Sequence, residues 1–226
     1  MKPIAHIEND YTEKFGIPRQ SGLVNENESV IIFDSEYSVP EAFRGIEEFS
    51  HLWIIWQFSE NESKEWSPTV RPPKLGGNKR MGVFATRSPF RPNPIGLSCV
   101  ELKEVIKTES GITLKVKGAD LMNGTPVYDI KPYLAYTDSH PEASKGFADD
   151  GRDENRLLVV IPEEAFKEFP SDKTNALKSV LSLDPRPGYS DDPERVYGLS
   201  YAGFNIKFNV DKNILTVTDI IKVEKE

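Results

Sequence analysis

The sequence predicts a mainly β protein: an antiparallel β-barrel without a Rossmann sheet, followed by a small α+β domain. Short runs of β-branched and aromatic residues recur every ten to twenty-five residues or so, with few helical patterns between them. This spacing favours an antiparallel barrel over a doubly wound sheet, in which helices alternate with strands. The sequence has no G-x-G-x-x-G loop, so a Rossmann-type dinucleotide or methyltransferase fold has no support.

Four elements are expected in the first 60 residues. Residues 4–8, 29–34 and 51–58 predict strands, because each run is short, apolar and rich in β-branched or aromatic side chains. The third run is apolar on both faces, which indicates a central strand. Residues 39–49 predict a short helix, with Ser38 as its cap and a proline in its first turn.

The middle of the chain predicts more strands around one irregular loop. Residues 87–96 contain three prolines, which cannot sit inside a helix or a central strand. Strands are expected on both sides of this loop, at residues 82–86, 97–107, 112–118 and 127–133. The second and third of these strands form a hairpin.

A change in composition divides the chain. Residues 137–156 are polar and rich in aspartate, so we expect a first domain of residues 1–140, a linker at 141–156 and a second domain of 157–226. The second domain predicts a strand, a helix and a terminal hairpin, at residues 157–161, 163–183, and 201–210 with 214–223.

The composition is that of a folded, soluble protein, with 38% apolar and 10% aromatic residues among 226. No apolar run exceeds five residues, whereas a membrane-spanning helix needs about 20. The start of the chain lacks the apolar core of a signal peptide. The single cysteine, Cys99, excludes an internal disulfide, and the three scattered histidines argue against a zinc site. We therefore expect a cytoplasmic protein without a membrane or a metal.

Positive charge is concentrated in one stretch, which we call the basic band. Residues 66–100 contain no Asp or Glu but six basic residues: Arg71, Lys74, Lys79, Arg80, Arg87 and Arg91. The other 191 residues carry 22 basic and 36 acidic groups, so the rest of the chain is strongly acidic. The protein is therefore acidic with one basic band, and its overall charge argues against indiscriminate binding of nucleic acid.

Two familiar motifs fail. Residues 77–82 have the glycine spacing of a P-loop, but Val83 stands where the phosphate-binding lysine belongs. Residues 96–100 lack the second glycine of a nucleophile elbow, so hydrolase chemistry at Ser98 is not expected.

Four unusual segments remain: residues 16–20 (GIPRQ), 70–96, 118–126 (GADLMNGTP) and 128–133 (YDIKPY). Together they resemble the TsaA-like/TrmO family, the tRNA adenine-N6 methyltransferases, over roughly residues 2–140. The resemblance implies S-adenosylmethionine held by a β-barrel without a Rossmann sheet. It also implies methylation at N6 of N6-threonylcarbamoyladenosine at position 37, in the tRNA anticodon loop.

The resemblance also implies which residues contact the cofactor. They lie in the first loop, after the third strand, around the proline-rich loop and in the turn after residue 118: Pro18, Arg19, Gln20, Ser59, Glu60, Arg87, Leu97, Asp120, Leu121, Met122 and Asn123. The family's site lies near a subunit interface, so a homodimer is expected.

The substrate residues follow from the basic band. Its cations can pair with phosphates and its aromatic residue can stack on a splayed base, which gives Arg71, Lys74, Lys79, Arg80, Phe90, Arg91 and Asn93. A methyl acceptor must also lose a proton. Asp129, Asp138 and the threonyl carboxylate of the substrate itself all remain candidates for the proton acceptor, with Asn93 as an orienting group.

Two other functions remain open. The chain could methylate an anionic small molecule with S-adenosylmethionine, the basic band then binding that substrate. It could also be a non-catalytic barrel that binds RNA or a nucleotide.

Overall fold

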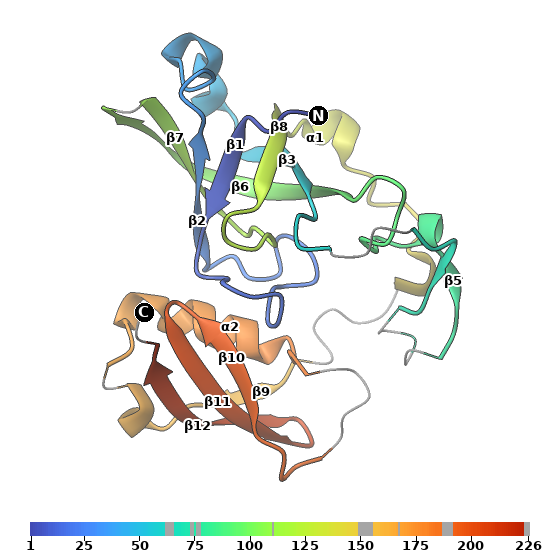
Figure 1. Cartoon of the computed structure of the whole chain (residues 1–226), viewed down its shortest axis with the longest axis vertical. Coiled ribbons are helices and arrows are strands. Elements are labelled where there is room, and N and C mark those ends of the chain that lie inside the picture. Colours follow the sequence, from blue (N-terminus) through green and yellow to red (C-terminus); the bar gives the residue numbers. More distant parts are fainter. Residues whose placement is uncertain are drawn as a thin grey trace.

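The computed structural model describes residues 1–61, 66–72, 75, 78–109, 111–148, 156–166, 168–186 and 192–223. In these residues it contains a closed antiparallel barrel and, beside it, a separate sheet covered by a helix (Figure 1). The mainly β fold with a barrel and a small α+β unit is thereby confirmed. No helix in the described part of the chain is long and apolar enough to cross a membrane.

The barrel closes in the order β1–β2–β7–β6–β3–β8. Buried and less buried side chains alternate along four of its strands and along the first half of a fifth, and closure pairs each strand on both sides. Its strands are β1 (Ala5–Glu8), β2 (Glu28–Phe33), β3 (His51–Gln57), β6 (Ile95–Thr108), β7 (Gly111–Lys117) and β8 (Pro126–Pro132). The strand expected at residues 51–58 is confirmed as β3, which pairs with both β6 and β8.

The short helix expected within residues 39–49 is present only as 3-10 turns, and its expected cap is wrong. The structure has two short 3-10 turns there, η1 (Pro40–Phe43) and η2 (Ile46–Glu48), separated by Gly45 with a φ of 85°. That left-handed residue interrupts any continuous helix. Ser38 is not a cap: its hydroxyl donates to the Ile112 carbonyl at 2.9 Å and accepts from the Ile112 amide at 2.6 Å.

The strand expected at residues 82–86 is also wrong. A two-residue strand, β5 (Met81–Gly82), pairs with β4 (Thr69–Val70), and a 3-10 turn, η4 (Val83–Ala85), follows it. We call residues 66–94 the arm. Residues 73, 74, 76 and 77 of this segment lie outside the described residues. Figure 1 shows β5 well away from the barrel.

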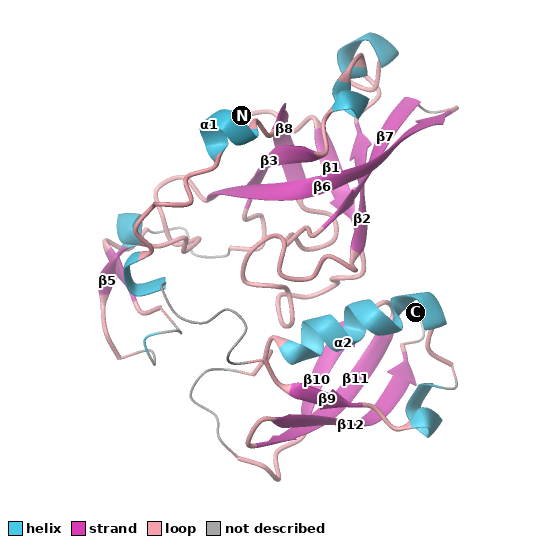
Figure 2. Cartoon of the chain, turned by 180° about the vertical axis from the view of Figure 1, so that it is seen from behind, coloured by secondary structure: helices cyan, strands magenta, loops and turns pink. Residues whose placement is uncertain are grey.

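The C-terminal unit, residues 157–223, is a four-stranded sheet in the order β10–β11–β12–β9. Helix α2 (Thr174–Ser182) lies along one face of this sheet (Figure 2) and buries Ala176, Leu177, Val180 and Leu181. The other elements are β9 (Leu158–Val160), η6 (Glu163–Phe166), η7 (Ser171–Lys173), β10 (Tyr197–Tyr201), β11 (Phe204–Asp211) and β12 (Ile214–Lys222). The helix is shorter than expected, because Pro170 and the 3-10 turns precede it.

The terminal hairpin is confirmed, but its first strand begins at Phe204 and not at residue 201. Tyr201 instead ends β10, a strand that the sequence analysis missed, and the chain turns at Ala202 and Gly203 with positive φ angles of 53° and 81°. Because YGLSY carries a glycine and a serine, it lacks the pattern of β-branched residues that predicts a strand.

Candidate cofactor and substrate site

Segments that are far apart in the sequence meet at the end of the barrel where β6 begins. The Gly22 amide donates to the Gly118 carbonyl at 2.9 Å, which joins the first loop to the turn after β7. The Cys99 amide donates to the Ser21 hydroxyl at 3.2 Å. The Arg87 guanidinium donates to the Gln20 side-chain carbonyl. The structure thus brings three of the four predicted cofactor segments together.

Asp120 lies at the centre of this cluster and ends a chain of hydrogen bonds. The Trp56 indole donates to the Ser98 hydroxyl at 2.9 Å, and that hydroxyl donates to Asp120 Oδ1 at 2.5 Å. Burial raises the pKa of Asp120, and the Ser98 bond and the nearby Arg87 charge offset this only in part. The carboxylate is therefore fixed in position but lacks full compensation for its charge.

Ser98 was not predicted as part of the site. It is 1% exposed on an inward-facing position of β6, where apolar residues are the rule. A serine at an interior position of an otherwise alternating strand is the one signal in the sequence that points to a buried polar partner.

The predicted turn at residues 120–123 is held from the first loop by Asn9, which the sequence analysis also missed. The Asn9 side-chain amide donates to the Leu121 carbonyl at 2.8 Å, and the Asn9 backbone amide donates to Asn123 Oδ1 at 3.0 Å. Leu121 points into the barrel core with no exposed surface, so only its main chain can face a ligand. Met122 is half-buried and Asn123 is exposed.

The proline-rich loop is braced from inside by Arg91. Its guanidinium donates to the carbonyl oxygens of Thr86 and Ser88, at 3.1 and 3.3 Å. These two residues flank Arg87, whose side chain is exposed. One predicted substrate residue therefore also shapes the loop that carries a predicted cofactor residue.

The other predicted cofactor residues lie around this cluster. Pro18 is buried, Arg19 is exposed and Gln20 is half-buried in the first loop. Ser59 and Glu60 follow β3 and are exposed, and the Glu60 carbonyl accepts a hydrogen bond from the Lys14 ammonium group.

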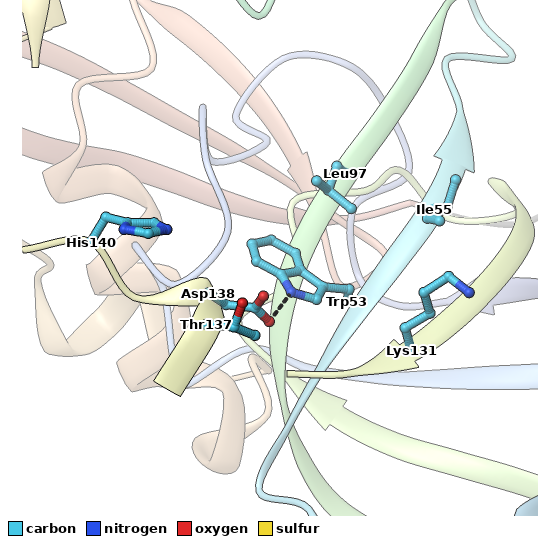
Figure 3. A pocket seen from close by; sticks show the side chains of 7 residues that line it. All are labelled: Trp53, Ile55, Leu97, Lys131, Thr137, Asp138 and His140. Carbon is cyan, nitrogen blue, oxygen red and sulfur yellow. Dashed lines mark hydrogen bonds between the residues drawn. The ribbon is translucent and has the colours of Figure 1, made fainter. Parts of the chain in front are cut away.

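Leu97 lies on the opposite face of β6 from Ser98, because side chains alternate along a strand. It is 58% exposed and lines an open pocket of about 380 Å³ on the outer face of the barrel (Figure 3). The pocket is lined by Trp53, Ile55, Leu97, Lys131, Thr137, Asp138 and His140. The predicted cofactor residues are thus divided between the end of the barrel and this outer pocket.

Asp138 ends α1 (Ala135–Asp138) beside this pocket and is held by two donors. The Trp53 indole donates to its Oδ2 at 2.8 Å (Figure 3), and the Leu134 amide donates to the same oxygen at 3.0 Å. The Leu134 amide and then the Trp53 indole lower the pKa of Asp138. A lowered pKa makes a carboxylate a weaker proton acceptor.

Asp129, the other candidate, pairs with the Lys131 ammonium group at 3.2 Å and accepts from the Ile130 amide at 2.9 Å. Both aspartates are therefore already bound to donors.

Most predicted substrate residues lie on the arm. Arg71, Lys79 and Arg80 are exposed, and the Arg80 guanidinium donates to the Thr69 hydroxyl at 2.9 Å. Phe90 is 43% exposed and Asn93 is exposed at the start of β6. Lys74 lies outside the described residues.

The arm also carries an aromatic pair that the sequence analysis missed. Trp66 and Phe84 stack with their ring centroids 6.5 Å apart and an interplanar angle of 22°. They are 51% and 73% exposed, which is unusual for large apolar rings. Both rings stand within a stretch free of acidic residues. Aromatic residues inside a basic stretch were the sequence signal that could have identified this pair.

Comparisons with known proteins identify the family. Residues 6–139 match the family model of the tRNA-methyltransferase O N-terminal domain, and residues 156–223 match that of the TrmO C-terminal domain. A tRNA (adenine(37)-N6)-methyltransferase of Escherichia coli (strain K12) is 43% identical over an alignment of 214 positions, which covers 92% of this chain and 91% of that protein.

Two further similarities come from Pseudomonas aeruginosa. A protein named as an S-adenosylmethionine-dependent methyltransferase is 34% identical over an alignment of 229 positions, which covers 97% of this chain and 96% of that protein. A crystal structure of TrmO has a TM-score of 0.78 at 30% identity, covering 97% of this chain and 96% of that chain. With both family models matched and this coverage along its length, the chain belongs to the TrmO family.

Proposed function

We propose that this chain is a tRNA (adenine(37)-N6)-methyltransferase that uses S-adenosylmethionine. Its similarity to the Escherichia coli enzyme of that name extends over both parts of the chain. The observation that carries the proposal is the meeting of Gln20, Arg87 and Asp120 at one end of a barrel, although 67 and 33 residues separate them along the chain.

The residues of this cluster fit the cofactor chemically. S-adenosylmethionine carries positive charge on its sulfonium and amino groups, and it also has a carboxylate, ribose hydroxyls and a purine. Asp120 offers a carboxylate whose pKa is raised by burial, and a cationic partner beside it would stabilise the ionised form. Arg87 offers a guanidinium that can pair with the cofactor carboxylate.

The cofactor supplies a methyl group already activated by attachment to a sulfonium. The task left to the chain is to hold the acceptor nitrogen in line with that group, which is a matter of positioning. The fixed turn at residues 120–123 and the braced proline-rich loop are rigid supports of the required kind.

We assign the outer pocket to the modified base, N6-threonylcarbamoyladenosine. Trp53 offers an apolar surface in this pocket on which the purine can lie. N6 gains a methyl group and loses its proton. Because Asp129 and Asp138 are both bound to donors, the threonyl carboxylate of the substrate is the favoured proton acceptor.

The anticodon loop is assigned to the arm. Arg71, Lys79 and Arg80 are exposed cations suited to phosphates, and the Trp66–Phe84 pair and Phe90 offer faces for unstacked bases. A single-stranded RNA loop presents phosphates and unstacked bases at once, whereas a small anionic substrate would leave the aromatic pair unused.

Three expectations extend this proposal. We keep the division at residues 141–156 into two domains, the cytoplasm as the location, and a homodimer. The exposed Leu97 and the open pocket support the dimer, because a second subunit would supply the missing wall. Sedimentation at micromolar concentration should show a dimer; a fully active monomer would exclude it.

The decisive experiment gives the purified protein labelled S-adenosylmethionine and tRNA from cells that lack this gene. Label should appear in tRNA, and mass spectrometry of its nucleosides should show a methylated N6-threonylcarbamoyladenosine. Label in small metabolites alone would support a small-molecule methyltransferase, and cofactor binding without transfer would support a non-catalytic barrel.

A further inference from the structure

We propose that the C-terminal unit acts on the cofactor site by holding the first loop, residues 9–28, in its binding arrangement, with Lys173, Leu199 and Tyr201 as positioning residues. The inference rests on the proposed function, because the loop carries three of the assigned cofactor residues. Figure 1 shows the loop extending from the barrel toward the C-terminal unit.

The loop contributes side chains to the core of the C-terminal unit and not to the core of the barrel. Tyr11 and Val24, 2% and 1% exposed, belong to the cluster formed by β10–β12 and α2, and Phe15 and Ile17 pack against it. The Tyr11 ring lies 5.8 Å from the Tyr201 ring. Without the C-terminal unit these apolar groups would face water, and the loop would lose its main hydrophobic support.

Polar contacts fix the same loop along its length. The Lys173 ammonium group binds Asp10 Oδ1 at 2.5 Å, and the side chain of Asp10 is only 19% exposed. The Tyr201 hydroxyl donates to Asn27 Oδ1 at 2.8 Å, where both residues are 1% exposed. The Ser200 amide donates to Glu13 Oε1 at 2.6 Å. These contacts join η7 and β10 to both ends of the loop.

The loop backbone also lies close to the C-terminal unit two residues before Pro18, at Gly16. A Cβ built on Gly16 would lie 2.1 Å from Leu199 Cδ1, and Gly16 has a φ of 87°. Glycine suits the left-handed backbone at this position, and any side chain there would have to displace the end of Leu199. Leu199 therefore acts as a surface against which the start of the cofactor segment is set.

The other side of the loop holds the cofactor turn. Asn9 binds Leu121 and Asn123, and the Asn123 amide donates to the Tyr11 carbonyl at 2.8 Å. Tyr11 thus has its ring in the C-terminal core and its carbonyl on the turn that follows Asp120. Contacts run without a gap from β10 through the loop to the assigned cofactor site.

When a loop must be ordered before a ligand can bind, the apparent Kd is the intrinsic Kd divided by the fraction of time that the loop is correctly placed. We therefore expect Lys173→Met to raise both the Kd and the KM for S-adenosylmethionine about fivefold, as when the loop is in place one fifth of the time. The kcat at saturating cofactor and the Kd for tRNA should stay within about twofold of the wild type.

The matched control is Lys178→Met, the same change on the exposed face of α2, where the ammonium group lies 5.9 Å from the Phe166 ring and does not contact the loop. Lys178→Met should leave the cofactor Kd unchanged. Lys173→Arg, which keeps a cation opposite Asp10, should restore most of the affinity. Hydrogen exchange of residues 16–22 without ligand should rise in Lys173→Met and not in the control.

A second variant tests the positioning role independently, in case Lys173→Met fails to fold. Tyr201→Phe keeps the ring but removes the hydroxyl that binds Asn27, and it should raise the cofactor Kd in the same direction. The positioning role is wrong if both variants bind the cofactor with the wild-type Kd at temperatures where they are folded. This holds whether or not the variants melt at a lower temperature than the wild type. Normal binding by Arg87→Ala and Asp120→Asn would instead overturn the proposed cofactor site and leave the loop contacts as they are.

Discussion

The end of the barrel and the arm are built in opposite ways. At the barrel end, Trp56, Ser98 and Asp120 form a buried chain of hydrogen bonds. On the arm, Trp66 and Phe84 are exposed aromatic rings among exposed cations. A small ligand needs donors and acceptors placed in advance, whereas a flexible polyanion needs charge and stacking surfaces that adapt to it. The two regions should therefore respond separately to mutation.

The largest effect is expected at Asp120. Asp120→Asn keeps the size and an acceptor for Ser98 but removes the charge, so the Kd for S-adenosylmethionine should rise about tenfold to a hundredfold, as for hydrogen bonds to charged groups. The Kd for tRNA should not change. Calorimetry with each ligand measures both.

Asp34→Asn is the matched control for this change. Asp34 follows β2, and since β2 and β7 are antiparallel, it lies at the other end of the barrel from Asp120. A similar loss of cofactor affinity in both variants would show that the effect is not specific to the cluster.

The same carboxylate gives a pH dependence. Burial raises the pKa of Asp120 above its ordinary 3.8, so the group becomes neutral at a higher pH than an exposed aspartate. Cofactor affinity should therefore weaken as the pH falls through this raised pKa, and Asp120→Asn should flatten the profile. The free energy of unfolding depends on pH in the opposite direction to cofactor affinity. The contribution of Asp120 to stability is greatest below pH 3.8, and it is lost as the pH rises through the raised pKa of this group. Titration of binding and of unfolding by urea, wild type against Asp120→Asn, separates the two signs.

Ser98→Ala should come next in size. It leaves the Trp56 indole and Asp120 Oδ1 without their shared partner, and an unsatisfied buried group costs about 1–3 kcal/mol of unfolding free energy. Chemical denaturation measures this loss. Ser200→Ala, which removes a half-buried hydroxyl from the C-terminal sheet, is the control. Equal losses in both variants would count against a special role for the hydrogen-bonded chain.

The sequence predicted the barrel well because its strands are signalled locally. Residues 51–58 carry the pattern of a buried strand within eight positions, and β3 forms there, at His51–Gln57. The same local reasoning failed at residues 39–49, where Gly45 adopts a left-handed backbone that divides an otherwise plausible helix. Tertiary context decided the outcome there.

The cofactor cluster could be predicted only through the family resemblance. The cluster exists only in the folded barrel, which brings together the segments that carry Arg87, Gln20 and Asp120. Asn9 and Ser98 were missed because their partners are 112 and 22 residues away, and no spacing rule reports such contacts. Long-range hydrogen bonds of this kind depend on the closed barrel and on its register.

The arm should respond to mutation in the binding of tRNA alone. Phe84→Ala removes a 73% exposed ring, and the loss of one stacking partner should weaken tRNA binding by about 1–3 kcal/mol, with the cofactor Kd unchanged. Leu158→Ala, at a 60% exposed apolar residue of β9, should change neither Kd. Fluorescence anisotropy with a labelled anticodon stem-loop measures the first value. A change in oligomeric state instead of RNA affinity would assign the ring to a subunit contact.

The smallest effect is expected at Arg80, whose guanidinium is exposed on the arm beside Thr69. A cation that contacts one phosphate lowers the steepness with which affinity falls with salt, by about one unit in a log–log plot. Arg80→Ala should therefore weaken tRNA binding modestly at low salt and reduce that slope. Lys107→Ala, at the distal end of β6 outside the basic band, should preserve the slope. If both substitutions lower the slope equally, RNA binding follows net charge and not the arm, and the contrast between the two regions disappears.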